Sequence, residues 1–187
     1  MAPPRQRPGA ASSSSSAPLP PLSIDPSVLL SDAISFSGTF PITIGANTIL
    51  HPRCKLNSTE GPIIVGSNCI VSEKTQLIAP DADGLVLGDY VLVEVNCTIH
   101  AARIGEGTSV EVGAKLGKAC RIGNNCTLSP LSTVPDGEVL PDYTVLYGET
   151  HRRLDISNTA AARNETLLAH IDCLKKLLPN KAEKYNR

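Results

Sequence analysis

The sequence contains very few aromatic side chains. Of its 187 residues, none is tryptophan and only two are phenylalanine, so aromatic residues make up 3% of the chain. Layered globular domains usually fill part of their core with such large side chains. A chain of this length that buries mainly Val, Ile, Leu, Ala, Thr and Cys is expected to have a narrow core. This favours a repetitive β-solenoid over a layered domain.

The chain also has no excess of either charge. Its formal net charge is −1, so it lacks the basic surface through which proteins bind nucleic acid or anionic membranes. It contains no apolar run long enough to span a bilayer. We therefore expect no nucleic-acid partner and no direct membrane insertion.

What the chain does contain is a six-residue period between residues 104 and 146. Aliphatic residues recur at every sixth position, namely Ile104, Val110, Leu116, Ile122, Leu128, Val134, Leu140 and Leu146. Mostly small residues follow four positions after the first seven of these, at Thr108, Ala114, Cys120, Cys126, Ser132, Glu138 and Thr144. A period of six fits neither an α-helix nor a simple alternating strand, and it predicts a parallel β-helix.

The strand period turns this pattern into a geometry. Each small residue lies two positions before the next aliphatic one, so both side chains point inward from one strand. The other hexad positions, such as Gly105, Gly117, Gly123, Asn124 and Asn125, suit corners that need a positive φ or a tight bend. Three strands and three corners give a coil of eighteen residues, and coils stack at about 4.8 Å.

A spacing of eighteen residues aligns aliphatic positions with one another throughout. It places Ile104 on Ile122 and Leu140, Val110 on Leu128 and Leu146, and Leu116 on Val134. The only charge in the small inward row is Glu138, which would be costly to bury without a partner. We therefore expect Glu138 near the open end of the coil.

The cysteines follow the same inward row. Five of the six stand two residues before an aliphatic residue, at Cys54, Cys69, Cys97, Cys120 and Cys126, and Cys173 lies apart. No C-x-x-C pair is present. The five are predicted to be buried, reduced thiols, which fits an intracellular protein better than disulfides or a zinc ribbon.

The remaining segments complete the predicted organisation. We expect a disordered Pro/Ser-rich tract at 1–22, whose prolines disfavour the helix of a mitochondrial presequence. Residues 23–151 are predicted to form six to seven coils, loosely in register at the start and interrupted by loops at 57–62 and 78–86. Residues 152–180 form a linker and an amphipathic helix, and 181–187 a frayed tail. The helix carries an apolar stripe of Leu167, Ile171, Leu174 and Leu178, expected to pack on the prism, with a neighbouring chain as the alternative.

Two enzyme classes share this architecture, and both depend on histidine. The chain resembles gamma-class carbonic anhydrases in plan, but their zinc site needs three histidines, two of them separated by four residues. Here Val95 stands five residues before His100, so the pair is incomplete. Hexapeptide acyltransferases use a histidine as general base, for which His100 or His51 is a candidate. The other histidines are His151 and His170. We predict no catalytic, cofactor-binding or metal-binding residue, with a trimeric hexapeptide enzyme as the alternative.

Longer motifs and the order of the interruptions are more specific than the hexads. They are Thr48–Cys54, Glu60–Gly66, Leu87–Asp89, Val93–Val95, Val134–Gly148, Arg152–Arg153 and Leu174–Asn180. On these residues the chain, over about 23–180, resembles the dynactin subunit 6 family. The resemblance implies a left-handed parallel β-helix with a C-terminal α-helix, acting as a non-enzymatic, cytoplasmic subunit of the dynactin pointed-end complex.

The same resemblance implies a set of partners. It implies pairing with dynactin subunit 5, next to the actin-related pointed-end subunit, dynactin subunit 4 and other dynactin subunits, with dynein and cargo adaptors as indirect partners. On the outside of the coil, the sequence predicts two short ladders of like charge, Glu94 with Glu111 and Arg103 with Arg121. These are either solvated surface or contacts for an oppositely charged partner.

Overall fold

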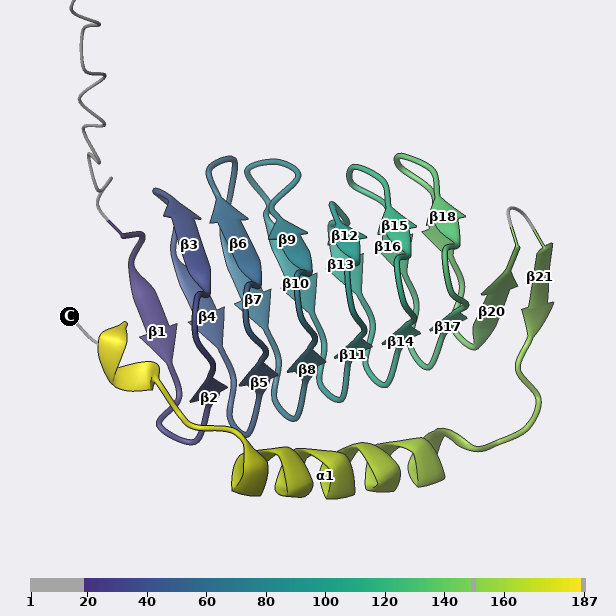
Figure 1. The fold of residues 1–187 in the computed structure, drawn as a ribbon. Helices are drawn as coiled ribbons and strands as arrows, with labels where there is room; N and C mark the ends of the chain where they lie inside the picture. Colours follow the sequence, from purple (N-terminus) through teal and green to yellow (C-terminus); the bar gives the residue numbers. More distant parts are fainter. Residues whose placement is uncertain (1–18, 149–150, 186–187) are drawn as a thin grey trace, which may run out of the picture.

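A computed structural model describes residues 19–148 and 151–185 as a parallel β-helix with one long α-helix along its side (Figure 1). Sheet A contains β1 (Leu22–Ile24), β4 (Ile42–Ile44), β7 (Ile63–Val65), β10 (Leu85–Leu87), β13 (Arg103–Ile104), β16 (Arg121–Ile122) and β19 (Val139–Leu140). Sheet B contains β2 (Leu29–Leu30), β5 (Ile49–Leu50), β8 (Ile70–Val71), β11 (Leu92–Val93), β14 (Ser109–Val110), β17 (Thr127–Leu128), β20 (Thr144–Tyr147) and β21 (His151–Leu154). Sheet C contains β3 (Ser35–Gly38), β6 (Lys55–Ser58), β9 (Gln76–Ile78), β12 (Thr98–Ile99), β15 (Lys115–Leu116) and β18 (Thr133–Val134).

The predicted register is confirmed. Ile104 pairs with Ile122, which pairs with Leu140, and Leu116 pairs with Val134. Sheets A and C contain only parallel pairs, while β21 folds back antiparallel on β20 at the end of sheet B. The first coil is more regular than predicted: β1 pairs with β4 residue for residue, at a spacing of twenty instead of eighteen. Both predicted interruptions lie at corners between sheets C and A, which tolerate added residues.

The inward row of small residues has a chemical role beyond its size. The Thr108 hydroxyl donates a hydrogen bond to the Gly123 carbonyl at 2.9 Å, and the Thr48 hydroxyl donates to the Gly66 carbonyl at 2.8 Å. The Cys97 and Cys126 thiols donate likewise to carbonyls of the next coil. Turn carbonyls buried beside the core are therefore satisfied from inside the prism, which explains why Thr and Cys recur in this row. The buried Ser132 hydroxyl makes no such bond.

The sequence predicts that Gly and Asn at the corners provide either a positive φ or room for a tight bend. In the structure, different residues have these two roles. Positive φ occurs at Asn125 (54°) and Gly107 (65°), whereas Gly105, Gly117 and Gly123 do not have positive φ. At these three positions an added Cβ would lie 2.4–2.5 Å from atoms of the next coil. These glycines are therefore needed for close stacking of the turns, and not for a left-handed conformation.

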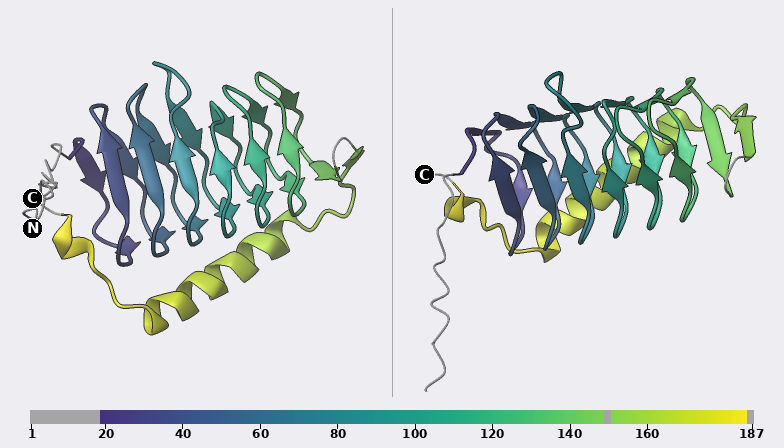
Figure 2. Two further views of the ribbon diagram at one scale, coloured as in Figure 1. Left: turned by 45° about the horizontal axis from the view of Figure 1, so that its top comes forward. Right: turned by 90° about the horizontal axis from the view of Figure 1, so that it is seen from above.

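Helix α1 (Ala160–Leu177) runs back along sheet B toward the start of the chain (Figures 1 and 2). Its buried residues Leu167 and Ile171 pack on Leu29, Ile49 and Ile70, the outward residues of β2, β5 and β8. The stripe predicted from the sequence is thus covered by the chain's own sheet. Near the start of the helix, the Arg163 guanidinium donates to the Thr127 hydroxyl at 2.9 Å and to the Asn125 carbonyl at 3.1 Å.

The segment after α1 seals the first coil, and the expected frayed tail is wrong for residues 181–185. The Asn180 side chain accepts from the Leu30 amide and donates to the Val28 carbonyl, and the Lys181 amide donates to the Leu30 carbonyl. A short 3₁₀ helix, η1 (Ala182–Lys184), then places Tyr185 edge-on against Phe36. These contacts satisfy strand edges that would otherwise be open, which fixes the segment. Residues 186–187, and 1–18 of the predicted disordered tract, lie outside the described residues.

Glu138 lies near the other end of the coil, as predicted. It directly precedes β19, the last strand of sheet A, and its carboxylate forms an ion pair with the Arg152 guanidinium in β21. Its side chain is 16% exposed. The charge is therefore compensated by the strand that folds back over the last coil, which removes most of the cost of partial burial.

Candidate interaction surface

The four histidines lie on separate elements. His51 follows β5, His100 follows β12, His151 begins β21 and His170 lies on α1. His151 stacks on Tyr147, with 5.4 Å between the ring centroids. Val95, where the carbonic anhydrase pattern has a histidine, is an exposed corner residue. Within residues 19–148 and 151–185, no three His, Cys, Asp or Glu side chains form a group that could hold a metal ion.

His51 is the histidine most influenced by its surroundings. Its side chain is half-buried, and burial of the imidazole lowers its pKa, an effect that Glu73 opposes and His170 reinforces. The shift favours the neutral form at neutral pH, as a general base requires. His100, the other candidate base, is likewise half-buried at a corner.

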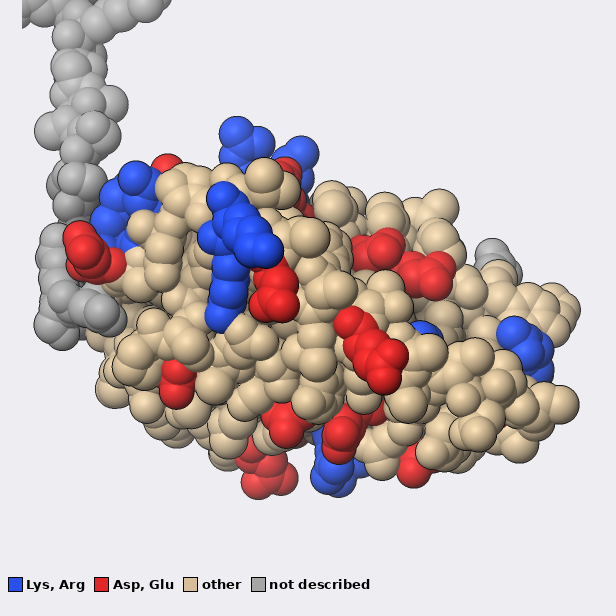
Figure 3. Space-filling view, turned by 90° about the horizontal axis from the view of Figure 1, so that it is seen from below, with Lys and Arg blue, Asp and Glu red and all other residues tan. Residues whose placement is uncertain are grey.

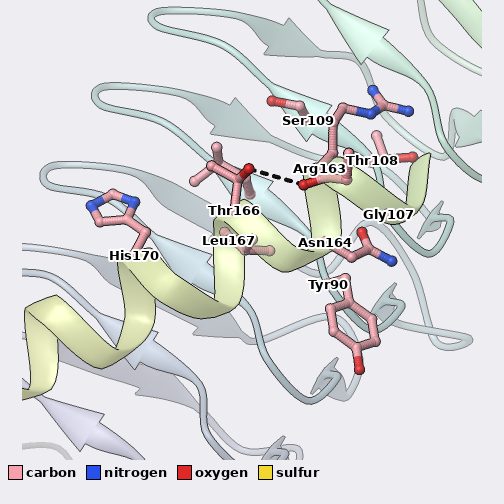
Figure 4. A pocket seen from close by; sticks show the side chains of 11 residues that line it. Tyr90, Gly107, Thr108, Ser109, Arg163, Asn164, Thr166, Leu167 and His170 are labelled. Carbon is pink, nitrogen blue, oxygen red and sulfur yellow. Dashed lines mark hydrogen bonds between the residues drawn. The ribbon is translucent and has the colours of Figure 1, made fainter. Parts of the chain in front are cut away.

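A cleft of about 320 Å³ lies between α1 and sheet B. It forms because the outward column of sheet B changes from large apolar residues to Ser109, while the helix continues straight above it. Leu92, Thr108 and Leu167 contribute to its walls. Figure 4 shows Arg163 and His170 at opposite ends of this cleft, with side chains that point in different directions. The cleft is thus a gap in packing whose polar groups do not converge on one point.

The five inward cysteines are fully buried, and Cys173 on α1 is exposed. Burial raises the pKa of Cys54, Cys69 and Cys120 to about 12, and it also raises the pKa of Cys97 and Cys126. Thiols with such values stay protonated at neutral pH and are poor nucleophiles. The sequence-based interpretation of these cysteines as inert core residues agrees with this environment.

We expect iodoacetamide at pH 8 to modify one cysteine of the native protein, Cys173, within minutes. The other five should react only after unfolding in denaturant, because they are both inaccessible and protonated. Mass spectrometry of tryptic peptides measures the adducts, and Cys173→Ser provides the control, since it should abolish native-state labelling. Native labelling of Cys97 or Cys126 at a similar rate would show that the coil opens under these conditions.

The two predicted like-charge ladders differ in the contacts that their side chains make. The Glu94 carboxylate accepts a hydrogen bond from the Val112 amide at 3.1 Å, and burial together with Glu94 raises the pKa of Glu111. Arg103 and Arg121 are directly paired and exposed on the outer face of sheet A. The glutamate ladder thus supports a corner, while the arginine ladder faces solvent.

Acidic groups at other corners also hold the stack together. Asp89 accepts a hydrogen bond from the Ser67 amide of the preceding coil at 2.7 Å, and Asp142 accepts one from the Asn124 amide of the coil before it.

Figure 3 shows acidic side chains spread along the coils on the face seen from below, with most Lys and Arg side chains in the left half, toward the C-terminal end of α1. No helix within the described residues combines the length and apolar character needed to cross a membrane.

Comparison with protein-family models gave no match. The chain is 30% identical over 152 residues to dynactin subunit 6 of Danio rerio, an alignment that covers 74% of this chain and 75% of that protein. Dynactin subunit 6 proteins from four other species match at 25–30% identity. A carbonic anhydrase of Methanosarcina thermophila is 31% identical over 144 residues, covering 63% of this chain and 57% of that enzyme.

Solved structures support the fold. A hexapeptide transferase family protein from Anaplasma phagocytophilum superposes with a TM-score of 0.73 at 17% sequence identity, covering 86% of this chain and 98% of that chain. At this level of identity the likeness concerns the fold alone. It agrees with the hexapeptide-repeat β-helix predicted from the sequence.

Proposed function

The chain belongs to the dynactin subunit 6 family, and from this premise we propose that it is a non-catalytic structural subunit of the cytoplasmic dynactin pointed-end complex. In that role it pairs with dynactin subunit 5 beside the actin-related pointed-end subunit and dynactin subunit 4. It contributes through other dynactin subunits to dynein cargo attachment on microtubules. The observation that carries the proposal is the 30% identity across three quarters of both chains.

The architecture suits a rigid spacer. Every coil is joined to the next by parallel strand pairs, and the long helix and the segment after it connect the last coil to the first. A continuous core of this kind resists bending and offers flat outer faces for docking. A rigid subunit of this kind holds its partners at a fixed distance and orientation, as an adaptor subunit requires.

The alternative is a trimeric hexapeptide enzyme, and the similarity to the Methanosarcina carbonic anhydrase is the observation in its favour. That activity needs three histidines around one zinc ion. In this chain Val95 stands where one histidine of the expected pair would be, so that pair is incomplete. The acyltransferase variant would use His100 or His51 as the base. It would also require identical subunits around a threefold axis.

The test is purification of the tagged full-length chain from its own cells at moderate salt, with identification and stoichiometry of the associated proteins. We expect one copy of the chain together with a second hexapeptide-coil protein and an actin-related protein. A homotrimer that contains zinc or binds an acyl donor would overturn the proposal, and His100→Ala would then be the first variant to assay.

A further inference from the structure

The outer face of sheet A is not covered by any described element. Its outward column runs along the whole prism through Ser23, Thr43, Ile64, Val86, Arg103, Arg121 and Val139. All of these are exposed except Val86, which is half-buried, and Val139 is 65% exposed. Sheet B presents the corresponding face to α1. Sheet A therefore offers a flat, solvent-exposed strip the length of the molecule.

The composition of this strip differs from that of ordinary solvated surface. It contains β-branched residues and two arginines, but no lysine and no acidic residue, whereas the outward column of sheet C includes Lys55 and Lys115. Surfaces that bind other proteins are enriched in arginine and depleted of lysine and glutamate at their centre. Ile64 and Val86 on one side and Val139 on the other flank the arginines with apolar side chains.

The arginine pair has an unfavourable component that no ion pair among the described residues offsets. Arg103 and Arg121 are directly opposite each other on neighbouring parallel strands, where like charges repel. Within residues 19–148 and 151–185, the ion pairs are Arg152 with Glu138 and Lys184 with Asp32, and neither involves this strip. Arg103 and Arg121 start from strands that lie about 4.8 Å apart, so their guanidinium groups can bind carboxylates presented side by side on a second surface.

We propose that the outer face of sheet A is the surface through which the chain docks onto its partner in the complex. The partner presents carboxylates to Arg103 and Arg121 and apolar side chains to Ile64 and Val86. A second copy of this chain is a poor occupant, because a twofold contact centred on the pair would set arginine against arginine. The inference rests on the proposed function, and it assigns the surface by which a different protein, and not another copy, is bound.

Charge reversal tests this assignment in the full-length tagged chain. The variant R103E/R121E is compared with K55E/K115E, which changes the net charge equally but on exposed positions of sheet C. We expect the wild type and K55E/K115E to recover the second coil protein and the actin-related protein equally well. R103E/R121E should recover at least about tenfold less, because it sets like charges against each other across the contact. Thermal melting of each purified variant establishes that all three are folded.

A second measurement locates the contact. The photo-cross-linker p-benzoylphenylalanine replaces Val139 in one sample and Thr133, an exposed residue of β18 on sheet C, in another. We expect the cross-linker at position 139, and not at position 133, to form adducts with a partner peptide that contains aspartate or glutamate. Equal recovery by R103E/R121E, or adducts between two copies of this chain, would overturn the inference. Failure of the wild-type chain to recover either protein would instead overturn the proposed function, and with it the partner assigned to this face.

Discussion

Replacing Ile122 by alanine is expected to lower the free energy of unfolding by about 2–5 kcal/mol. Ile122 is 1% exposed and stands between Ile104 and Leu140 in an inward column of sheet A. Strand hydrogen bonds in all three sheets fix the backbone around the core, so neighbouring side chains cannot move in to fill the space left by the missing atoms. The substitution therefore loses both the burial of the side chain and its packing contacts, and it leaves a cavity.

The neighbouring residue provides a matched control. Arg121 belongs to the same two-residue strand but points outward and is exposed. We expect Arg121→Ala to change the free energy of unfolding by less than about 0.5 kcal/mol, because the lost side chain is exposed and its repulsion from Arg103 is relieved. Urea denaturation followed by circular dichroism measures both variants. Equal effects at the two positions would contradict the inward and outward assignment of the strand.

The position of this column could be predicted from the sequence because burial in a β-helix is strictly periodic. A one-residue error in register would turn Ile122 outward and Arg121 inward, so the hexads determine the faces almost uniquely. The five inward cysteines followed from the same rule. The hexads predict the register of the first coil less well, because its spacing of twenty residues breaks the period while its strand pairing remains intact.

Contacts between distant segments could not be predicted in this way. Nothing periodic marks Asn180 as the residue that pairs with β2, 150 residues earlier in the chain. The polar residues that follow it predict a frayed end, yet polar groups in this segment satisfy exposed strand edges. The candidate docking strip on sheet A was predicted only in part. The arginine ladder is visible in the sequence, but that no described element covers sheet A depends on where α1 packs.

Close stacking of the coils also requires glycine at the corner between sheets A and B. Gly45, Gly66, Gly88, Gly105 and Gly123 follow successive strands of sheet A and stack on one another's turns. A Cβ at Gly105 would lie 2.4 Å from the Gly123 carbonyl carbon and 2.6 Å from the Asn124 amide nitrogen. These are backbone atoms of the next coil, so they cannot move aside without disturbing the pairing of β13 with β16.

Gly105→Ala is therefore expected to destabilise the protein by about 3 kcal/mol, at the upper end of the range for overpacking. Since Gly105 does not have positive φ, alanine carries no conformational penalty there, and the reduced entropy of the unfolded chain would even favour it. Only the clash can produce a loss. Gly137→Ala provides the control, because Gly137 has a φ of +67° but an added Cβ would meet nothing within 4 Å. That variant should cost only about 1–2 kcal/mol, from left-handed backbone strain. If Gly137→Ala were the more damaging of the two in urea denaturation, backbone conformation would govern the glycine column, and close stacking of the coils would not.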